Sequence, residues 1–381
     1  MTDVTLEATR EAVRGAKRLV VKIGSSSLTS VAGGLNRDHL RALTTALAQH
    51  RAAGHEVILV SSGAIAAGLE PAGLPKRPKD LATQQAAAGV GQGLLMAAYT
   101  TVLREHAVVP GQVLLTADDL IRRTQYRNAQ RAIERLLALG VMPIVNENDA
   151  VATHEIRFGD NDRLAALVAH LTHADALVLL SDVDALYTAP PGDPDSRRVD
   201  FVPDQDALAA YGIGGTGAAG TGTGGMMTKV QAATMAADSG IPTVLTAADN
   251  VYRALAGEDI GTYFAVTHRR RQTRLLWLAH LAQTLGSIRI DDGAVRAISR
   301  RGTSLLAAGV TGIDGEFEAG DPVDVRDSDG RLVARGLVNF ATHELPDMFG
   351  LSTDELGRRF GDDYRKEIIH RNDLVLTDAV F

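Results

Sequence analysis

The amino-acid sequence predicts an α/β protein in two parts: a mainly parallel sheet sandwiched by helices, then a small β-rich module. Two observations carry this prediction. As far as about residue 250, short apolar segments alternate with longer helix-periodic segments, which is typical of a parallel sheet covered on both faces. From Gly286 onward, short alternating segments punctuated by Gly and Asp indicate β-strands and turns instead.

Each strand predicted in the first part is a short apolar run that ends in a polar or glycine-containing turn. These strands are Leu19–Ile23, Glu56–Val60, Val109–Leu115, Met142–Val145, Ala176–Leu180 and Pro242–Leu245. The helix-periodic segments are Asn36–Ala53, Ala64–Leu69, Asp80–His106, Thr124–Leu139, Arg163–Leu171 and Met226–Ser239. Residues 186–202 are expected to form a hairpin-like excursion. Ligands of open α/β sheets bind at the carboxyl ends of the strands, so that edge is where a site is expected.

The second part is expected to contribute further short strands. They fall at Ser287–Ile290, Asp321–Val325, Leu332–Asn339 and Asp373–Leu376. We therefore predict one domain over residues 1–265, a linker over 266–285 and a β-rich domain over 286–381. The basic run at 268–271 is interpreted as a solvated face of the linker, because the chain as a whole is acidic.

Composition excludes several classes of function. The 381 residues carry a net charge of −7, which argues against a dominant nucleic-acid or membrane surface. Because there is no cysteine, disulfides, zinc–thiolate sites and thiol catalysis are excluded. The first 18 residues lack the apolar core of a signal peptide, and no apolar run approaches the roughly 20 residues of a membrane span. We expect a cytoplasmic protein without a membrane partner.

One stretch, residues 141–169, concentrates polar groups at a predicted strand end and at the following helix start. Asn146 to Asp149 follow the strand, and Asp160 to Asp162 open the helix. A plainer interpretation is that such residues only cap the helix and form turns. However, a cap needs one or two oxygens, whereas these two clusters supply seven amide or carboxyl side chains within 17 residues. We interpret the stretch as a candidate site.

Two lysines occupy places that favour a bound anion. Lys22 lies in an apolar strand just before Gly24, and a buried ammonium is costly without an anion; the alternative is a lysine that extends to solvent at the strand end. Lys229 falls in the first turn of a helix that follows a glycine-rich loop, Thr221–Gly225. Helix N-termini attract phosphate and disfavour cations. A negative group is therefore expected beside Lys229.

These features favour phosphoryl transfer to a carboxylate. Neither GxxxxGK[ST] nor a GxGxxG after the first strand is present, so a P-loop and a dinucleotide fold are unsupported. A helix terminus contributes about 1 kcal/mol to anion binding, whereas enzymes supply roughly 8–23 kcal/mol, so two converging lysines would have to contribute more. No histidine is placed as a base. A carboxylate needs none, because its pKa near 4 leaves it ionised at neutral pH.

Several segments together resemble the amino acid kinase family, specifically its glutamate 5-kinase branch. They are 20–29 (VVKIGSSSLT), 60–68 (VSSGAIAAG), 141–152 (VMPIVNENDAVA), 158–169 (FGDNDRLAALVA), 179–188 (LLSDVDALYT) and 221–229 (TGTGGMMTK). The tail segments 286–298 and 301–310 resemble the PUA module that many such kinases carry. The resemblance implies the amino acid kinase fold, and ATP-dependent phosphorylation of the L-glutamate γ-carboxylate to L-glutamyl 5-phosphate, the first step of proline biosynthesis.

The resemblance also implies roles for individual residues. Lys22 and Lys229 would neutralise the transferring phosphoryl group, and Asp162 would hold both lysines in register. The residues implied to bind glutamate are Ser62, Asp149 and Asn161, with Asp149 suited to the ammonium. The residues implied to bind ATP are Lys22, Ser181, Asp182, Thr223, Gly224, Gly225, Met226, Met227, Thr228 and Lys229. Mg²⁺ would be held by the ATP phosphates rather than by a protein metal site.

Proline inhibition at or near the glutamate site, and a homo-oligomer (dimer or tetramer), are further implications. Ala185, Ser61 and Ser181 depart from residues frequent in the family, which affects fine nucleotide contacts. Two alternatives stay open: a kinase for another carboxylate, such as aspartate or N-acetylglutamate, and an RNA-binding regulator with a vestigial kinase domain. Asp149 argues against N-acetylglutamate, whose nitrogen is uncharged. The PUA-like module leaves RNA binding open.

Overall fold

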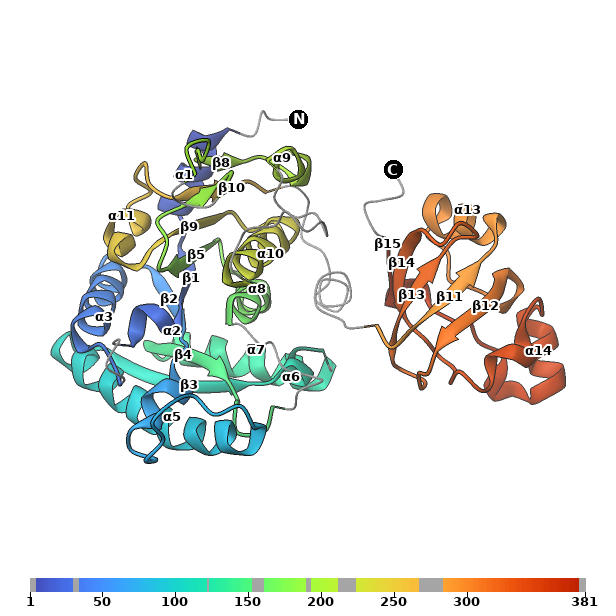
Figure 1. Ribbon diagram of the computed structural model, residues 1–381, viewed down its shortest axis with the longest axis horizontal. Coiled ribbons are helices and arrows are strands. Elements are labelled where there is room, and N and C mark those ends of the chain that lie inside the picture. Colours follow the sequence, from blue (N-terminus) through green and yellow to red (C-terminus); the bar gives the residue numbers. More distant parts are fainter. Residues whose placement is uncertain are drawn as a thin grey trace. The chain divides into compact units, whose positions relative to one another are not determined.

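The computed structural model describes residues 5–29, 34–121, 123–152, 161–189, 193–211, 224–266 and 284–376. The chain divides into two compact units, Met1–Arg271 and Gln272–Phe381 (Figure 1). Most of the predicted linker, residues 267–283, lies outside the described residues. Each unit has its own sheet and its own buried core, so each is described by itself.

An eight-stranded sheet forms the centre of the first unit, in the order β3-β4-β2-β1-β5-β9-β10-β8. Its strands are β1 (Arg18–Ile23), β2 (Glu56–Val60), β3 (Val109–Leu115), β4 (Val141–Glu147), β5 (Ala176–Ser181), β8 (Phe201–Val202), β9 (Thr243–Ala247) and β10 (Thr262–Phe264). The strands from β3 to β9 pair in parallel, and β10 runs antiparallel to β9. The predicted fold class is confirmed.

Helices cover both faces of this sheet (Figure 1). They are α1 (Leu6–Arg14), α2 (Ser25–Leu28), α3 (Arg37–Ala52), α4 (Ala64–Leu69), α5 (Leu81–Glu105), α6 (Ala117–Ile121), α7 (Arg123–Ala138), α8 (Asn161–Leu171), α9 (Gln205–Ala210), α10 (Gly224–Asp238) and α11 (Val251–Leu255). The sequence pattern did not predict α1, α2, α6, α9 or α11, each of which has nine residues or fewer. The expected hairpin is present: β6 (Leu186–Tyr187) pairs antiparallel with β7 (Arg198–Val199).

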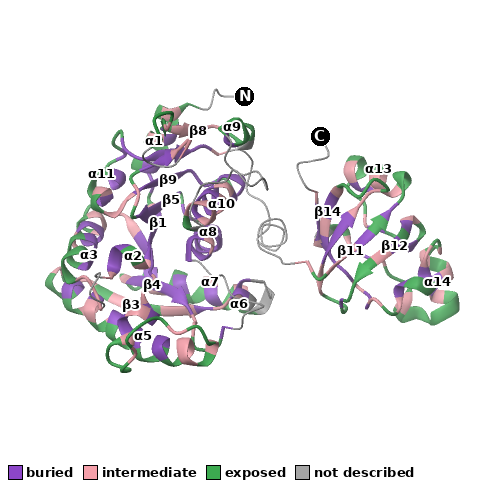
Figure 2. Ribbon diagram, in the orientation of Figure 1, coloured by how far each residue is buried: buried purple, intermediate pink, exposed green. Residues whose placement is uncertain are grey.

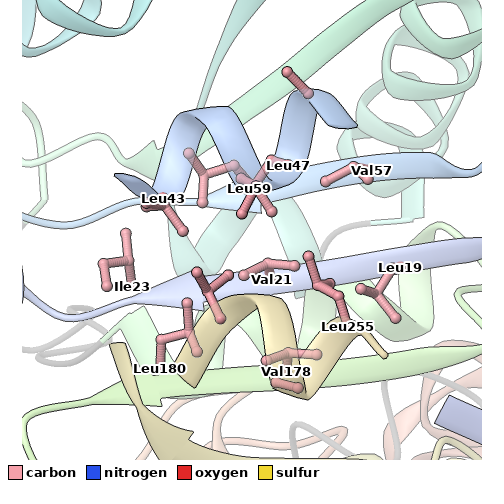
Figure 3. Close-up of a cluster of buried hydrophobic side chains, with 14 of the residues drawn as sticks. Leu19, Val21, Ile23, Leu43, Leu47, Val57, Leu59, Val178, Leu180 and Leu255 are labelled. Atoms are coloured by element: carbon pink, nitrogen blue, oxygen red, sulfur yellow. The ribbon is translucent and has the colours of Figure 1, made fainter. Parts of the chain in front are cut away.

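The two faces of strand β1 have different neighbours. Leu19, Val21 and Ile23 share a buried cluster with Leu43 of α3 and Leu255 of α11 (Figure 3). Because successive side chains of a strand point to opposite faces, Lys22 belongs to the other face. Helix α8 packs against β1 there. Strand β1 and helix α8 are buried almost throughout (Figure 2).

Helix α5 packs unusually closely against α4. A Cβ atom added to Gly91 would lie 1.8 Å from the Ala64 carbonyl oxygen, and one added to Gly68 would lie 1.9 Å from that of Ala87. Only glycine permits this approach. Within the described residues, α5 is also the one helix long and apolar enough to cross a membrane, a test that core helices of soluble proteins pass as well. Its packing against α4 accounts for the buried part of this helix, which is 39% of the apolar window.

The second unit contains a five-stranded sheet in the order β12-β11-β13-β14-β15. The strands are β11 (Gly286–Ile290), β12 (Val310–Gly315), β13 (Pro322–Arg326), β14 (Leu332–Leu337) and β15 (Leu374–Leu376). Two helices that the pattern did not predict, α13 (Asp292–Arg301) and α14 (Thr353–Phe360), accompany the sheet. Both carry side-chain N-caps, from Asp291 and Ser352, so local capping explains where they begin.

Candidate active site

The candidate site lies where four central strands of the first unit end together. Lys22 of β1 is level with Val60 of β2 on one side and Leu179 of β5 on the other. Val60 is in turn level with Val145 of β4. The residues at and just beyond these strand ends are therefore brought to one edge of the sheet. Among them are Ser61, Ser62, Asn146 and Ser181.

Two lysines from distant parts of the chain meet at a single carboxylate. Lys22 forms an ion pair with Oδ1 of Asp162. The Nζ atom of Lys229 lies 3.1 Å from Oδ2 of the same residue. Asp162 is fully buried, and the two lysines are 2% and 9% exposed. The structure thus brings together the three residues that the sequence singled out as catalytic.

The start of α10 explains how a lysine is tolerated at a helix N-terminus. Lys229 donates a second hydrogen bond, of 3.0 Å, to the Gly225 carbonyl oxygen of its own helix. Asp162 supplies the negative group that the sequence led us to expect. Thr228, expected only as a nucleotide contact, also donates to Oδ2 of Asp162, at 3.2 Å. Arg163 of α8 donates to Gln231 of α10 at 2.5 Å, which further joins the two helices.

A second polar cluster surrounds Asn161, the residue before Asp162. Its Nδ2 atom donates to the Ser61 carbonyl oxygen at 2.6 Å, to Oγ of Ser62 at 3.1 Å and to Oδ1 of Asn146 at 2.7 Å. Asn161 and Asn146 are both buried. Of the three residues predicted to bind glutamate, the structure therefore brings Ser62 and Asn161 into direct contact.

The remaining predicted residues lie around these two clusters or outside the described residues. Asp149 is half-buried in a turn just beyond β4, in which the Asn148 carbonyl oxygen accepts from the amides of Val151 and Ala152. At the end of β5, Ser181 donates to Oδ1 of Asp182 at 2.9 Å. Of the loop and helix start, Gly224 to Lys229 belong to α10, whereas Thr223 lies outside the described residues.

The sequence analysis missed a set of buried residues that support the second cluster. Gln92 of α5 accepts a hydrogen bond of 2.8 Å from Nδ2 of Asn146. The hydroxyl groups of Tyr99 and Ser61 are 2.8 Å apart. Burial raises the pKa of Tyr99, so its phenol stays protonated at any ordinary pH. The sequence signal that could have revealed this role is the recurrence of polar residues on the buried side of an Ala-rich helix.

The charges of the first cluster suit a multiply charged anion. Two ammonium groups and one carboxylate leave a net charge of +1 in a place largely shielded from water. Coulomb attraction in such surroundings is several times stronger than in bulk water. The arrangement can hold a phosphoryl group while charge shifts during its transfer. Among the described residues, no group of three or more His, Asp or Glu side chains could hold a metal ion.

Comparisons with known proteins agree with this chemistry. The amino acid kinase family model matches residues 17–247, and the PUA domain model matches residues 286–359. The glutamate 5-kinase of Streptomyces coelicolor is 59% identical over 367 residues, covering 96% of this chain and 98% of that protein. The glutamate 5-kinase of Thermobifida fusca is 57% identical over 369 residues, covering 97% and 95%.

Among solved structures, a carbamate kinase from Giardia lamblia bound to AMP-PNP superposes with a TM-score of 0.50 at 19% identity. The match covers 67% of this chain and 100% of the carbamate kinase chain, and it supports the fold alone. The family models and the full-length relatives lead to one assignment. The chain belongs to the amino acid kinase family and, within it, to the glutamate 5-kinases that carry a PUA domain.

Proposed function

We propose that this protein is an ATP-dependent glutamate 5-kinase: it phosphorylates the γ-carboxylate of L-glutamate to L-glutamyl 5-phosphate, the first step of proline biosynthesis. The observation that best supports this proposal is that two lysines form ion pairs with one buried carboxylate, Asp162, beside a polar cluster of amide and hydroxyl groups. The relatives that match almost the whole chain are glutamate 5-kinases.

In this proposal, a γ-carboxylate oxygen of glutamate attacks the γ-phosphorus of ATP, and ADP leaves with the bridging oxygen. Lys22 and Lys229 offset the charge of the phosphoryl group in flight, and Asp162 keeps the two ammonium groups at one point. No general base is required, because the attacking carboxylate is already ionised. Positioning and electrostatic stabilisation supply most of the catalysis in such transfers.

Ser62, Asn161 and Asp149 are proposed to bind glutamate, with Asp149 facing its ammonium group. Ser181, Asp182 and the segment Thr223–Lys229 are proposed to bind ATP, since a helix N-terminus offers unpaired N–H groups to phosphate. We propose Mg²⁺ as the companion of ATP. It would be bound chiefly by phosphate oxygens, the usual mode of Mg²⁺ at nucleotide sites.

The further proposals concern regulation and assembly: proline as feedback inhibitor at or near the glutamate site, a homo-oligomer, and a cytoplasmic location. Two large apolar side chains support a contact with a second copy. Val109 is 61% exposed on the edge strand β3, and Leu139, before the neighbouring β4, is 60% exposed. Exposed apolar groups beside a free sheet edge are typical of a surface that another chain covers.

A trapping assay tests the function directly. The purified protein is incubated with ATP, Mg²⁺, hydroxylamine and either L-glutamate, L-aspartate or N-acetyl-L-glutamate. Glutamate should yield a hydroxamate from the acyl phosphate, and the other two substrates much less. A folded protein that forms no hydroxamate from glutamate would refute the proposal. More hydroxamate from aspartate or N-acetylglutamate than from glutamate would show that the protein is a kinase for that other substrate.

The alternative of an RNA-binding regulator is not favoured. The match covers 98% and 95% of the length of two glutamate 5-kinases. Residues 284–376 contain more Asp and Glu than Lys and Arg, whereas binding to the phosphate backbone requires a positive surface. Tight RNA binding that weakens steeply with salt, in a protein that forms no hydroxamate, would reverse this judgement.

A further inference from the structure

Helix α5 carries three polar residues that each contact a different segment of the proposed glutamate pocket. Gln85 donates a hydrogen bond of 3.2 Å to the Ala152 carbonyl oxygen. Gln92 accepts from Asn146 at 2.8 Å, and Tyr99 pairs with Ser61 at 2.8 Å. None of these three residues belongs to the catalytic or ligand set described above.

The spacing of these residues is regular. Gln85, Gln92 and Tyr99 follow one another at intervals of seven residues. Seven residues make about two turns and a rise of roughly 10 Å, so the three side chains lie along one stripe of the helix. The two C-terminal residues of the stripe are strongly buried: Gln92 is 9% exposed and Tyr99 is not exposed at all. Polar groups in such places are costly unless bonded.

Each contact stabilises a backbone or side chain next to a proposed glutamate ligand. Ala152 closes the turn that contains Asp149. Asn146, held by Gln92, accepts in turn from Asn161 at 2.7 Å. Ser61, held by Tyr99, directly precedes Ser62. The stripe therefore reaches all three proposed ligands through one intermediate each.

The hydrogen bonds also pass around the carboxyl edge of the sheet. Met142, Ile144 and Tyr99 share the core cluster on the side of α3 and α5. Asn146 continues this alternation, because Met142, Ile144 and Asn146 are two residues apart on β4. Asn161 belongs to α8, which packs on the opposite face with Asp162 and Lys22. Asn146 thus joins α5 on one face to α8 on the other.

We infer that α5 is the positioning element of the glutamate pocket, and that Gln85, Gln92 and Tyr99 are positioning residues for this substrate. The inference rests on the proposed function, and it separates the two halves of the site. The phosphate half is assembled from β1, α8 and α10. The glutamate half is set by the stripe on α5. Loss of a stripe residue therefore weakens glutamate binding selectively and leaves ATP binding intact.

The test compares Gln85→Leu, Gln92→Leu and Tyr99→Phe with the wild-type protein, by steady-state kinetics with glutamate and ATP varied separately. Each variant should raise the KM for glutamate, by about 5- to 100-fold, the range expected when a buried partner loses its hydrogen bond, with Gln92→Leu the largest effect. The KM for ATP should stay within about twofold, because the observed hydrogen bonds of the stripe do not involve the phosphate half.

Matched controls come from the same chain. Gln84→Leu makes the same chemical change one residue away, where the side chain donates to the Pro78 carbonyl oxygen instead. Tyr263→Phe removes a buried phenol that donates to the Glu258 carbonyl oxygen, far from the site in the sheet order. Both controls should leave the KM for glutamate unchanged. Thermal unfolding of every variant identifies any that fail to fold.

A double-mutant cycle provides a second measurement if Gln92→Leu does not fold. Tyr99→Phe and Ser61→Ala remove the two ends of one hydrogen bond, so their effects on the glutamate KM should be far from additive. Equal increases in both KM values, an effect as large in the controls, or additive behaviour of this pair would overturn the inference. If the wild-type protein forms no hydroxamate from glutamate, the proposed function fails instead, before any variant is compared.

Discussion

Asn161 and Asp162 are neighbours in the first turn of α8, yet their side chains join different clusters. Asn161 donates to Ser62 and Asn146, on the side proposed for glutamate. Asp162 binds Lys22 and Lys229, on the side proposed for phosphate. In the proposed function, this one helix turn would set the distance between the two substrates, on which an in-line transfer depends.

Lys229→Ala should lower kcat by about 10²- to 10³-fold, the loss typical when one stabilising charge is removed from a transition state. The KM for glutamate should change little, because Lys229 contacts Asp162 and Gly225 rather than the glutamate cluster. Initial rates with varied glutamate measure both constants. A comparable loss in kcat and in glutamate affinity would show that the role of Lys229 is misassigned.

Asp162→Asn should destabilise the first unit. The change leaves two buried ammonium groups without their carboxylate, and breaking a buried ion pair costs about 3–5 kcal/mol. Urea unfolding measures the free energy of unfolding, with Asp206→Asn as a control because that carboxylate is exposed. Added Mg²⁺-ATP should raise the free energy of unfolding more in the variant than in the wild-type protein. Unchanged stability would contradict the burial argument.

Gly91→Ala and Gly93→Ala, two residues apart and therefore on nearly opposite sides of α5, should have opposite effects. Alanine at 91 would place its Cβ atom 1.8 Å from the Ala64 carbonyl oxygen, so α4 and α5 must separate. At 93 a Cβ atom meets nothing within 4 Å, and alanine favours a helix over glycine by about 1 kcal/mol. Thermal unfolding should show Gly91→Ala below the wild type and Gly93→Ala at or above it.

Acid should destabilise the first unit partly through His50. Burial, and secondly the charge of His55, lower the pKa of His50 to about 4 from its ordinary 6.5. The unfolded chain therefore binds a proton at this histidine below about pH 6.5, whereas the folded chain binds it only below about pH 4. The free energy of unfolding falls as the pH drops through that interval. His50→Phe replaces the imidazole that stacks on His55 with another aromatic ring, which cannot titrate. It should lose less stability between pH 6.5 and 4; equal losses in both proteins would contradict the assignment.

Truncation after Leu285 should leave measurable kinase activity. The lysines, Asp162 and the polar cluster all belong to the first unit, and the second unit has a separate sheet and core. The hydroxamate assay on the truncated chain, with light scattering to follow its assembly, provides the measurement. Complete loss of activity in a folded and correctly assembled fragment would mean that the second unit contributes to the site.

The sequence predicted six of the eight strands of the first sheet, as short apolar runs, and its long helices, by their periodicity; it did not predict β10, and β8 fell within the expected hairpin-like excursion. It also singled out Lys22 and Lys229, since each is a cation in a place where a positive charge is unfavourable without a partner, whereas the role of Asp162 was implied by the family resemblance. The second unit was predicted less completely. Its helices α13 and α14, which the pattern did not predict, span only ten and eight residues.

What the sequence determined by itself is local: which segments are strands or helices, which residues are charged, and which motifs resemble a family. Only the tertiary structure decided which oxygen of Asp162 meets which lysine, and that Gln85, Gln92 and Tyr99 of an Ala-rich helix reach the glutamate side of the site. The physical reason is that hydrogen bonds and ion pairs depend on distances of a few ångströms between groups. In this protein those distances are set by sheet register and helix packing across nearly the whole first unit, which no local pattern of residues encodes.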